Sequence, residues 1–437
     1  MNFLVHTYGC QMNVRDSEAI EVLMESAGHK KVASEQDADV VLVNSCTVRQ
    51  KAEEKAIGKA GNLLAAGKIV GLMGCAVKRV GEDVFKRLPR LHFALGPRKF
   101  SEVARYVERA AAGECGMMDL GGDEIPPDLS LHPASSGCGT FSDVRSYVTV
   151  MIGCDNRCSY CIVPDVRGHE YSRPRTEVVE EVRCLARRGV KEVCLLGQSV
   201  LRYPSFPSLL RELQEIDGLE RIRFTSAHPK GCTEELLAAY RDCPKVCRHL
   251  HLPVQSGSDA ILREMGRRYT RAEYLLAVKM LRDFDPEFAV TTDVIVGYPG
   301  ESIEDFEATR SLMEEAGFDN AFIFKYSPRP GTRSALLPDD VPSEEKERRD
   351  QVLLADQEVR GQRRNDALVG SVREVMAEGP SKRNRRRWSG RDSGNRIVVW
   401  DRPDGEDTSI GDIVSLRIHS AHPQTLFGEM VCGERGV

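Results

Sequence analysis

Over most of its length this chain alternates short β-branched runs with stretches of helical periodicity. In residues 1–110, apolar runs are separated by amphipathic or Ala/Lys/Glu-rich segments. Strands that alternate with helices form a parallel sheet covered on both faces, so we expect an α/β domain here. The expected strands are residues 2–7, 38–45 and 68–73, and the expected helical stretches are residues 18–24, 48–64, 83–88 and 101–111.

The same alternation resumes at Tyr147 with six βα-type units. Parallel strands that are each followed by a helix form a barrel or a partial barrel, with chemistry at the carboxyl ends of the strands. We therefore expect a partial (β/α)6 barrel. Its expected strands are residues 147–152, 192–197, 221–226, 249–254, 288–297 and 320–326.

Two segments of different composition complete the chain. Residues 113–145 are rich in Gly, Pro, Ser and Asp, which predicts a linker. Beyond a charged helical stretch at residues 343–368, short strands separated by turn residues predict a small all-β domain. Its expected strands are residues 372–378, 395–400, 412–419 and 426–431. The expected organisation is an α/β domain, a linker, a barrel and a small β-barrel at residues 1–112, 113–145, 146–365 and 366–437.

Charge and hydropathy narrow the classes of function. The 437 residues carry 61 Lys and Arg against 66 Asp and Glu, and this net charge of −5 excludes a globally basic nucleic-acid binder. The start of the chain lacks the pattern of a signal peptide, and no stretch approaches the roughly 18 uncharged apolar residues of a membrane span. We expect a cytoplasmic protein with no membrane contact, in which some of the 14 cysteines form metal or redox sites rather than disulfides.

The strongest local motif is a loop with three cysteines directly after the first barrel strand. Cys154, Cys158 and Cys161 lie within eight residues, and three thiolates on one tight loop can hold three irons of a cubane cluster. The fourth iron would stay open for a small ligand. A zinc site remains an alternative, with His169 as a possible fourth ligand, because structural zinc is usually four-coordinate.

A second set of cysteines is spread over the N-terminal region. Cys10, Cys46 and Cys75 each lie just past a predicted strand, and the carboxyl ends of parallel strands share one edge of a sheet. Each adjoining loop leads into a helix, whose N-terminal dipole favours a thiolate. We expect the three cysteines to converge at that edge. The alternative is three unrelated buried cysteines.

A basic run stands out near the C-terminus. Residues 382–391 contain six Lys or Arg, with Trp388 among them. Such a run is usually a solvated face. On a small β-barrel it can also contact RNA phosphates while the aromatic residue stacks on a base.

The loop motif, with its strand context, resembles the radical S-adenosylmethionine superfamily. That resemblance implies a [4Fe–4S] cluster on Cys154, Cys158 and Cys161, whose open iron binds the amino and carboxylate groups of S-adenosylmethionine. It also implies that Tyr160 lies near the adenine of the cofactor, although Tyr160 could equally be a packing residue of the loop.

Motifs along essentially the whole chain extend the resemblance to the methylthiotransferases. They are TYGCQMNVRDSE, NSCTVRQKAEEKA, GCAVKR, GCDNRCSYCIVPDVRGHEYSRP, LLGQSV, HLPVQSGSD, TTDVIVGYPGE and YSPRPGT. The resemblance implies a second, auxiliary [4Fe–4S] cluster on Cys10, Cys46 and Cys75 that carries the donated sulfur. It also implies a radical S-adenosylmethionine barrel and a C-terminal β-barrel of the TRAM type.

The C-terminal stretch GPSKRNRRRWSGRDSGNRIVVW is similar to the tRNA-modifying branch of that family. The implied reaction places a methylthio group on C2 of N6-dimethylallyladenosine in tRNA near the anticodon. Asp392 stands where the branch usually has Thr, and Ser199 where the barrel motif usually has Asn. Alternatives are a threonylcarbamoyladenosine tRNA, an aspartate of a ribosomal protein, or a non-enzymatic iron–sulfur redox sensor that binds RNA.

The resemblance carries further expectations. The partners would be tRNA and an electron donor such as flavodoxin or ferredoxin, and the chain would be a monomer. Because the methylthio donor and the radical must meet at one base, the carboxyl edge of the N-terminal sheet should face the barrel mouth, and both cysteine sets should open into one cavity.

No acid or base catalyst is assigned. Cys243, Cys247, His249 and His251 form a weaker metal candidate, and residues 297–301 could form a tight turn or approach the cofactor.

Overall fold

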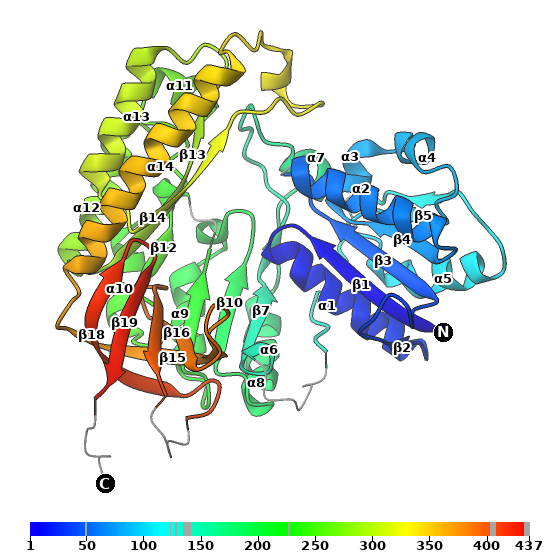
Figure 1. Ribbon diagram of the computed structural model, residues 1–437, viewed down its shortest axis with the longest axis horizontal. Helices are drawn as coiled ribbons and strands as arrows, with labels where there is room; N and C mark the ends of the chain where they lie inside the picture. Colours follow the sequence, from blue (N-terminus) through cyan, green and yellow to red (C-terminus); the bar gives the residue numbers. More distant parts are fainter. Residues whose placement is uncertain are drawn as a thin grey trace.

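The computed structural model describes residues 1–48, 50–122, 124–126, 129–133, 141–225, 228–402 and 408–431. It contains an N-terminal α/β domain, a half-barrel and a closed C-terminal barrel (Figure 1). In the described part of the chain, no helix is long and apolar enough to cross a membrane.

The N-terminal domain is a six-stranded parallel sheet with helices on both faces, as expected. Consecutive residues of its central strand enter two separate hydrophobic clusters, Val41 and Val43 on one face and Val40 and Leu42 on the other. The strand order is β2-β1-β3-β4-β5-β6. The strands are β1 (Asn2–Tyr8), β2 (Lys30–Lys31), β3 (Val40–Ser45), β4 (Ile69–Met73), β5 (Phe93–Leu95) and β6 (Met117–Asp119). The helices are α1 (Gln11–Ser26), α2 (Gln50–Ala65), α3 (Cys75–Val80), α4 (Asp83–Arg87) and α5 (Val103–Ala111), with a 3-10 turn at Phe100–Glu102.

The central region forms the expected partial barrel from two parallel sheets of three strands. An isolated parallel bridge links Ile222, on β11, to Val246, three residues before β12 begins. The barrel strands are β7 (Arg145–Thr149), β10 (Glu192–Leu196), β11 (Arg221–Phe224), β12 (His249–His251), β13 (Ala289–Val296) and β14 (Asn320–Lys325). The expected strand at residues 147–152 ends early, and its last part, β8 (Met151–Ile152), instead pairs with β9 (Tyr171–Ser172).

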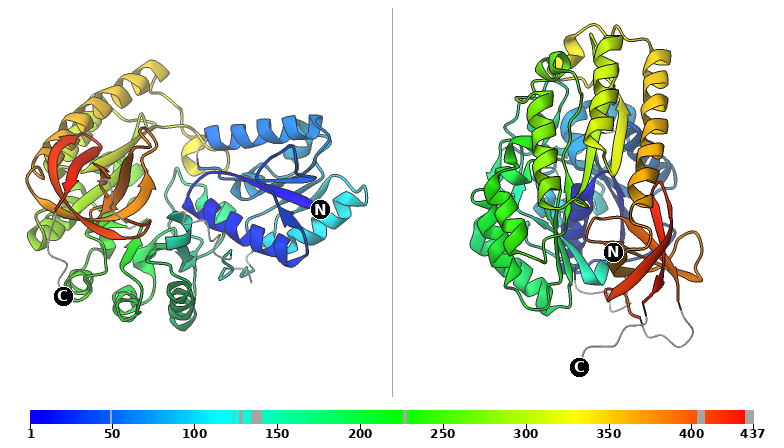
Figure 2. Two further views of the ribbon diagram at one scale, coloured as in Figure 1. Left: turned by 60° about the horizontal axis from the view of Figure 1, so that its bottom comes forward. Right: turned by 90° about the vertical axis from the view of Figure 1, so that its left-hand side faces the viewer.

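The outer face of the half-barrel packs against helices in one large hydrophobic core. Figure 2 shows these helices from two further sides. The helices of this region are α6 (Phe141–Val144), α7 (Val163–Arg167), α8 (Arg175–Arg187), α9 (Phe206–Gln214), α10 (Glu234–Asp242), α11 (Asp259–Glu264), α12 (Arg271–Phe284), α13 (Ile303–Ala316) and α14 (Ser343–Asp366). Short 3-10 turns lie at Val200–Arg202, Pro229–Gly231 and Arg333–Leu336.

The C-terminal domain is a closed barrel of five strands in the order β15-β16-β17-β19-β18. The strands are β15 (Val372–Pro380), β16 (Arg387–Asp392), β17 (Ile397–Asp401), β18 (Ile413–His422) and β19 (Thr425–Met430). The sequence predicted four strands and missed β16, which overlaps the end of the basic run. Trp388 on β16 is only 9% exposed and lies in the barrel core. The centroid of its ring is 6.4 Å from that of Trp400. The expectation that Trp388 is available to stack on a base is therefore wrong.

The C-terminal barrel docks against the amino ends of the half-barrel strands. Arg221, the first residue of β11, donates to the carbonyls of Arg391 at 2.6 Å and Glu374 at 2.9 Å. Arg223 donates to the carbonyl of Asp392 at 2.7 Å. Asp392 is 2% exposed, and its carboxylate accepts from the backbone N–H of Arg396. The residue that departs from the tRNA branch is thus part of a buried turn and does not face solvent.

Candidate functional site

The structure brings the three N-terminal cysteines together at one sheet edge. They follow β1, β3 and β4, which are neighbours in the sheet. A hydrogen bond with the Cys46 thiol and the nearby Arg167 charge lower the pKa of Cys10 to about 6. The same contact with Cys10, together with burial, raises the pKa of Cys46. The charge of Cys75 raises it further. Each thiol therefore lies within electrostatic reach of another, so they form one group.

A buried polar network holds this edge in place. The Asn44 side chain, at the end of β3, donates to the carbonyl of Asn13 at 2.9 Å and to Ser17 Oγ at 3.0 Å, both on α1. Cys10 donates from its Sγ to Asn13 Oδ1 at 3.3 Å. The first turn of α1 and the end of β3 are thereby locked together beside Cys10 and Cys46.

The second set of cysteines lies on the loop between β8 and α7. Cys158 Sγ accepts from Arg267 Nη1 at 3.5 Å, and Cys154 Sγ accepts from Asn156 Nδ2 at 3.4 Å. Burial raises the pKa of Cys161 to about 12. Ser159 fixes the loop against the end of α11, because its Oγ donates to the carbonyl of Glu264 at 2.8 Å.

Each donor set offers three thiols, the number that leaves one iron of a cubane cluster open. Among the residues that the structure describes, no three His, Cys, Asp or Glu side chains are placed to hold one metal ion. A tetrahedral zinc would need thiolates about 3.8 Å apart, whereas a cubane binds its cysteines at separate corners. His169, the alternative zinc ligand, is 69% exposed and contacts Asp155 at 2.9 Å instead. In number and chemistry, the three thiols of each set match the ligands of a three-thiolate cluster site.

The carboxyl edge of the N-terminal sheet faces the barrel, as expected (Figure 1). Cys75 packs against Ile162 and Val166, which directly follow the second cysteine set. Arg167, the last residue of α7, donates from Nε to Cys75 Sγ at 3.0 Å. The two cysteine sets thus lie on either side of a single interface between the domains.

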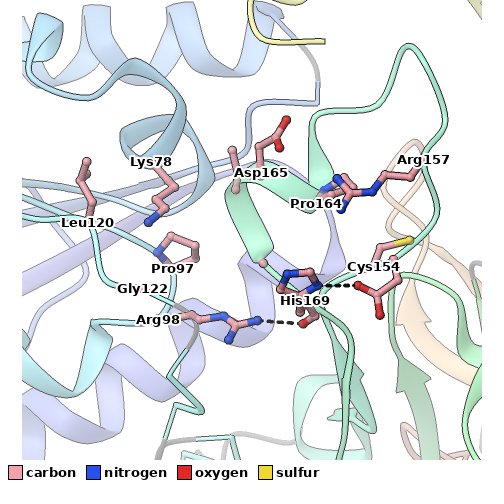
Figure 3. Close-up of a pocket in the computed structure, with 13 residues that line it drawn as sticks. Lys78, Pro97, Arg98, Leu120, Gly122, Cys154, Arg157, Pro164, Asp165 and His169 are labelled. Carbon is pink, nitrogen blue, oxygen red and sulfur yellow. Dashed lines mark hydrogen bonds and ion pairs between the residues drawn. The ribbon is translucent and has the colours of Figure 1, made fainter. Parts of the chain in front are cut away.

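A pocket of about 270 Å³ opens at this interface. Figure 3 shows Lys78 and Arg98 on one side of it, and Cys154 and His169 on the other. Of the six candidate ligands only Cys154 lines it, so this pocket is not the shared cavity that we expected. Its walls are Lys78, Pro97, Arg98, Leu120, Gly122, Cys154, Asp155, Arg157, Pro164, Asp165, Val166, Gly168 and His169.

The remaining sequence candidates have ordinary structural partners. Tyr160 packs against a hydrophobic cluster that includes Met265 and Tyr298, and burial raises its pKa well above the usual value. His249 and His251 each share a hydrogen bond of 3.0 Å with Thr291 Oγ1.

The structure also shows what surrounds the turn at residues 297–301 and the side chain of Ser199. A Cβ at Gly297 would lie 2.3 Å from Lys346 Cγ, so the turn packs against α14. Glu301 in this turn pairs with Arg349 at 2.6 Å. Ser199 Oγ, just after β10, is buried without a hydrogen-bond partner in the described part of the chain.

Three arginines around the cysteines were missed by sequence reasoning: Arg98, Arg167 and Arg267. Arg167 lies inside a motif that carries the family resemblance, but nothing in its local pattern indicates a partner in another domain. Arg98 and Arg267 lie outside any recognised pattern. Contacts between residues so far apart in sequence carry no periodic signal.

Three family descriptions match separate parts of the chain. They are the Radical SAM superfamily over residues 148–313, Uncharacterized protein family UPF0004 over residues 2–96, and the TRAM domain over residues 366–431. The three matched segments correspond to the half-barrel, the N-terminal sheet and the C-terminal barrel.

Curated relatives match nearly end to end. Proteins from Opitutus terrae, Akkermansia muciniphila and Geobacter sulfurreducens are 40%, 41% and 42% identical to this chain. The matches cover 98%, 99% and 98% of this chain and 97%, 99% and 97% of those proteins. All three are named tRNA-2-methylthio-N(6)-dimethylallyladenosine synthase.

Solved structures share the fold at low sequence identity. The radical S-adenosylmethionine methyltransferase TsrM from Kitasatospora setae aligns with a TM-score of 0.57 at 14% identity, over 77% of this chain and 75% of that one. The cobalamin-dependent S-adenosylmethionine radical enzyme OxsB aligns with a TM-score of 0.53 at 12% identity, over 82% and 56%. These likenesses support the arrangement of the α/β domain and the half-barrel.

Proposed function

The chain belongs to the family of tRNA-2-methylthio-N(6)-dimethylallyladenosine synthases, which are radical S-adenosylmethionine methylthiotransferases, and from this premise we propose its reaction. It transfers a methylthio group to C2 of N6-dimethylallyladenosine in tRNA near the anticodon. The observation that carries the proposal is that both three-cysteine sets lie at one interface, where Cys75 contacts α7 next to the second set. The chain also matches these synthases over almost its full length.

The chemistry of the substrate explains why such a site is needed. An aromatic C–H has no acidic proton and no leaving group, so acid–base catalysis is inadequate for the substitution. Clusters and S-adenosylmethionine, when bound, would supply the radical and the sulfur, and the residues of this chain would place the reacting atoms.

We propose that each cysteine set holds one [4Fe–4S] cluster with three thiolates. Cys154, Cys158 and Cys161 would leave one iron open for the amino and carboxylate groups of S-adenosylmethionine, with Tyr160 near its adenine. Cys10, Cys46 and Cys75 would hold the auxiliary cluster. The convergence of these three thiols at the carboxyl ends of neighbouring strands supports this assignment.

We propose that the C-terminal barrel binds the RNA through four basic side chains. Lys382, Arg383, Arg385 and Arg386 are exposed, and no ion pair joins them to another described residue. Arg387 and Arg391 are already paired, with Asp401 at 2.9 Å and Glu378 at 3.0 Å. Four cations on one short loop favour phosphate contacts, which need only a local positive patch.

Several finer expectations complete the proposal. A small redox protein such as flavodoxin or ferredoxin would supply electrons, and the chain would act as a monomer in the cytoplasm, where its substrate is made. The domains would comprise residues 1–112, 146–365 and 366–437, joined by the linker at residues 113–145.

Nucleoside analysis of tRNA by mass spectrometry tests the proposal. Cells that lack the gene should lose the 2-methylthio derivative and accumulate N6-dimethylallyladenosine, and the intact gene should reverse both changes. Loss of methylthiolated threonylcarbamoyladenosine would instead identify the sibling tRNA reaction. Unmodified aspartate in a ribosomal protein would identify the protein-modifying reaction. Reduced, reconstituted protein that forms no 5′-deoxyadenosine from S-adenosylmethionine would favour the redox sensor.

A further inference from the structure

Arg167 connects the two cysteine sets through its side chain. It ends α7, the short helix that begins two residues after Cys161. Its Nε donates to Cys75 Sγ at 3.0 Å, and its Nη1 and Nη2 donate to the Asp16 carboxylate at 3.3 and 2.5 Å. One guanidinium therefore joins the loop of the barrel cluster to a ligand of the auxiliary set and to α1.

The N-terminal domain also binds the backbone of Arg167. Arg98, which follows β5 of the N-terminal sheet, donates to the Arg167 carbonyl from Nε at 3.1 Å and from Nη2 at 2.6 Å. Arg98 also donates to the carbonyl of His169 at 3.0 Å. The N-terminal domain therefore binds Arg167 at two places: Asp16 holds the guanidinium beside Cys75, and Arg98 holds the backbone carbonyl.

Burial makes the Arg167 contact electrostatically strong. The Arg167 side chain is 7% exposed and that of Asp16 is 12% exposed. A buried guanidinium needs a partner charge, which Asp16 supplies to one edge of its planar fork. The other edge donates to sulfur. A lysine would keep the charge but could not present two such edges in fixed directions.

Donors to a cysteine that ligates a cluster change the cluster's reduction potential. Hydrogen bonds to the sulfur and nearby positive charge both favour the reduced form, which carries one more negative charge. Resting on the two-cluster assignment proposed above, we propose that Arg167 is a positioning residue of the auxiliary site. It orients Cys75 and raises the reduction potential of the auxiliary cluster relative to that of the barrel cluster.

A purely structural ion pair is the competing explanation, and Arg98 provides a matched control for it. Arg98 is also a buried arginine that crosses the interface, but the contacts given above are to backbone carbonyls rather than to a thiol. Loosened domain docking would affect both arginine variants. A specific effect on the auxiliary cluster would be confined to Arg167.

The test is a redox titration of the reconstituted full-length holoenzyme, in which electron paramagnetic resonance measures the reduction of each cluster. The step whose signal changes when S-adenosylmethionine is added belongs to the barrel cluster, and the other step belongs to the auxiliary cluster. In the R167M/D16N double variant, which leaves no buried unpaired carboxylate, we expect the auxiliary step to become more negative. A tenfold change in the ratio of reduced to oxidised cluster corresponds to about 59 mV for one electron.

The comparison among variants decides the proposal. The barrel step should stay in place in the double variant, R167K should move the auxiliary step back toward the wild-type value, and R98M should move neither step. An auxiliary step at the wild-type potential in the double variant, or equal shifts of both steps, would overturn the role of Arg167. The potentials are measured without tRNA, so an enzyme that makes no methylthiolated nucleoside would refute the proposed function and leave this result intact.

Discussion

The two cysteine sets have the same number of thiols, but they are assembled in opposite ways. Cys154, Cys158 and Cys161 share one loop, so their spacing follows from eight consecutive residues. Cys10, Cys46 and Cys75 follow three neighbouring strands, so their spacing follows from the register of β1, β3 and β4. The first set is local, and the second exists only when the sheet has formed in its correct order.

The residues that hold the two sets in place also differ: those around the loop come from one domain, and those around the sheet edge come from two. The loop is fixed by contacts from within its own barrel, through Ser159 and Arg267. The sheet edge is fixed partly by Asn44 inside its domain and partly by Arg167 from the barrel. A site assembled from distant segments therefore depends on the interface as well as on its own domain.

The largest effect is expected from removing the local set. Replacing Cys154, Cys158 and Cys161 by Ala should lower the iron content from about eight to about four per chain and abolish cleavage of S-adenosylmethionine. Iron analysis and chromatography of 5′-deoxyadenosine measure the two effects. The control C184A, at an exposed cysteine outside both sets, should keep all the iron. A triple variant with full iron content would refute the assignment.

Removing the distributed set should separate the two chemical functions. Replacing Cys10, Cys46 and Cys75 by Ala should also leave about four irons, but cleavage of S-adenosylmethionine should continue. Transfer of the methylthio group to tRNA should stop, because the sulfur donor is lost. Incubation with tRNA and mass spectrometry of its nucleosides measures this. Methylthio product from this variant would place the sulfur donor elsewhere.

A single glycine substitution beside each set should weaken cluster binding at that set alone. Gly74 has φ +94°, and a Cβ there would lie 2.3 Å from Asn44 Oδ1, so G74A should displace Cys75 and weaken only the auxiliary cluster. Gly153 has φ +76°, and a Cβ there would lie 2.0 Å from the His169 carbonyl, so G153A should weaken only the barrel cluster. Iron content and cleavage of S-adenosylmethionine distinguish the two variants.

The control for these glycine variants is G67A. Gly67 has φ +75° but no atom within 4 Å of an added Cβ. It should cost about 1 to 2 kcal/mol of stability from backbone strain and leave both clusters in place. Equal loss of iron in all three variants would mean that strain alone, rather than the position of the cysteines, controls cluster binding.

The smallest effect on the clusters is expected from the RNA-binding loop. Replacing Lys382, Arg383, Arg385 and Arg386 by Gln should raise the KM for tRNA and reduce the slope of log affinity against log salt by up to about 3.6. Cleavage of S-adenosylmethionine without tRNA should not change. Binding titrations at several salt concentrations provide the measurement. W388F serves as the control, because the buried indole should affect barrel stability and leave tRNA affinity unchanged. An unchanged salt slope in the Gln variant would show that the loop is only a solvated face.

Strand prediction succeeded where the local signal was long. The expected strands of the N-terminal sheet correspond to β1, β3 and β4, and all six barrel strands are present, although β12 covers only His249–His251 of the expected residues 249–254. Short apolar runs between turn residues are a local property of the sequence. The short strands β2, β5 and β6 were not expected, since two or three residues carry no periodicity.

The missed strand β16 shows the limit of that reasoning. Its residues alternate between partly exposed and buried, with Trp388, Gly390 and Asp392 inside. A buried Gly and a buried Asp do not look apolar in the sequence, so the alternation was hidden and the segment was interpreted as a basic run. Closure of the barrel, rather than β-propensity, buries these three residues.

The sequence by itself determined the α/β alternation, the three-part organisation and the six candidate cysteines with their division into two sets. These features follow from spacing along the chain and from the rule that parallel strands end at one edge. Only the tertiary structure decided that Arg167 reaches Cys75, 92 residues away, and that Trp388 turns into the barrel core. The physical reason is that such contacts depend on how whole elements pack, and packing geometry leaves no periodic trace in the residues that it brings together.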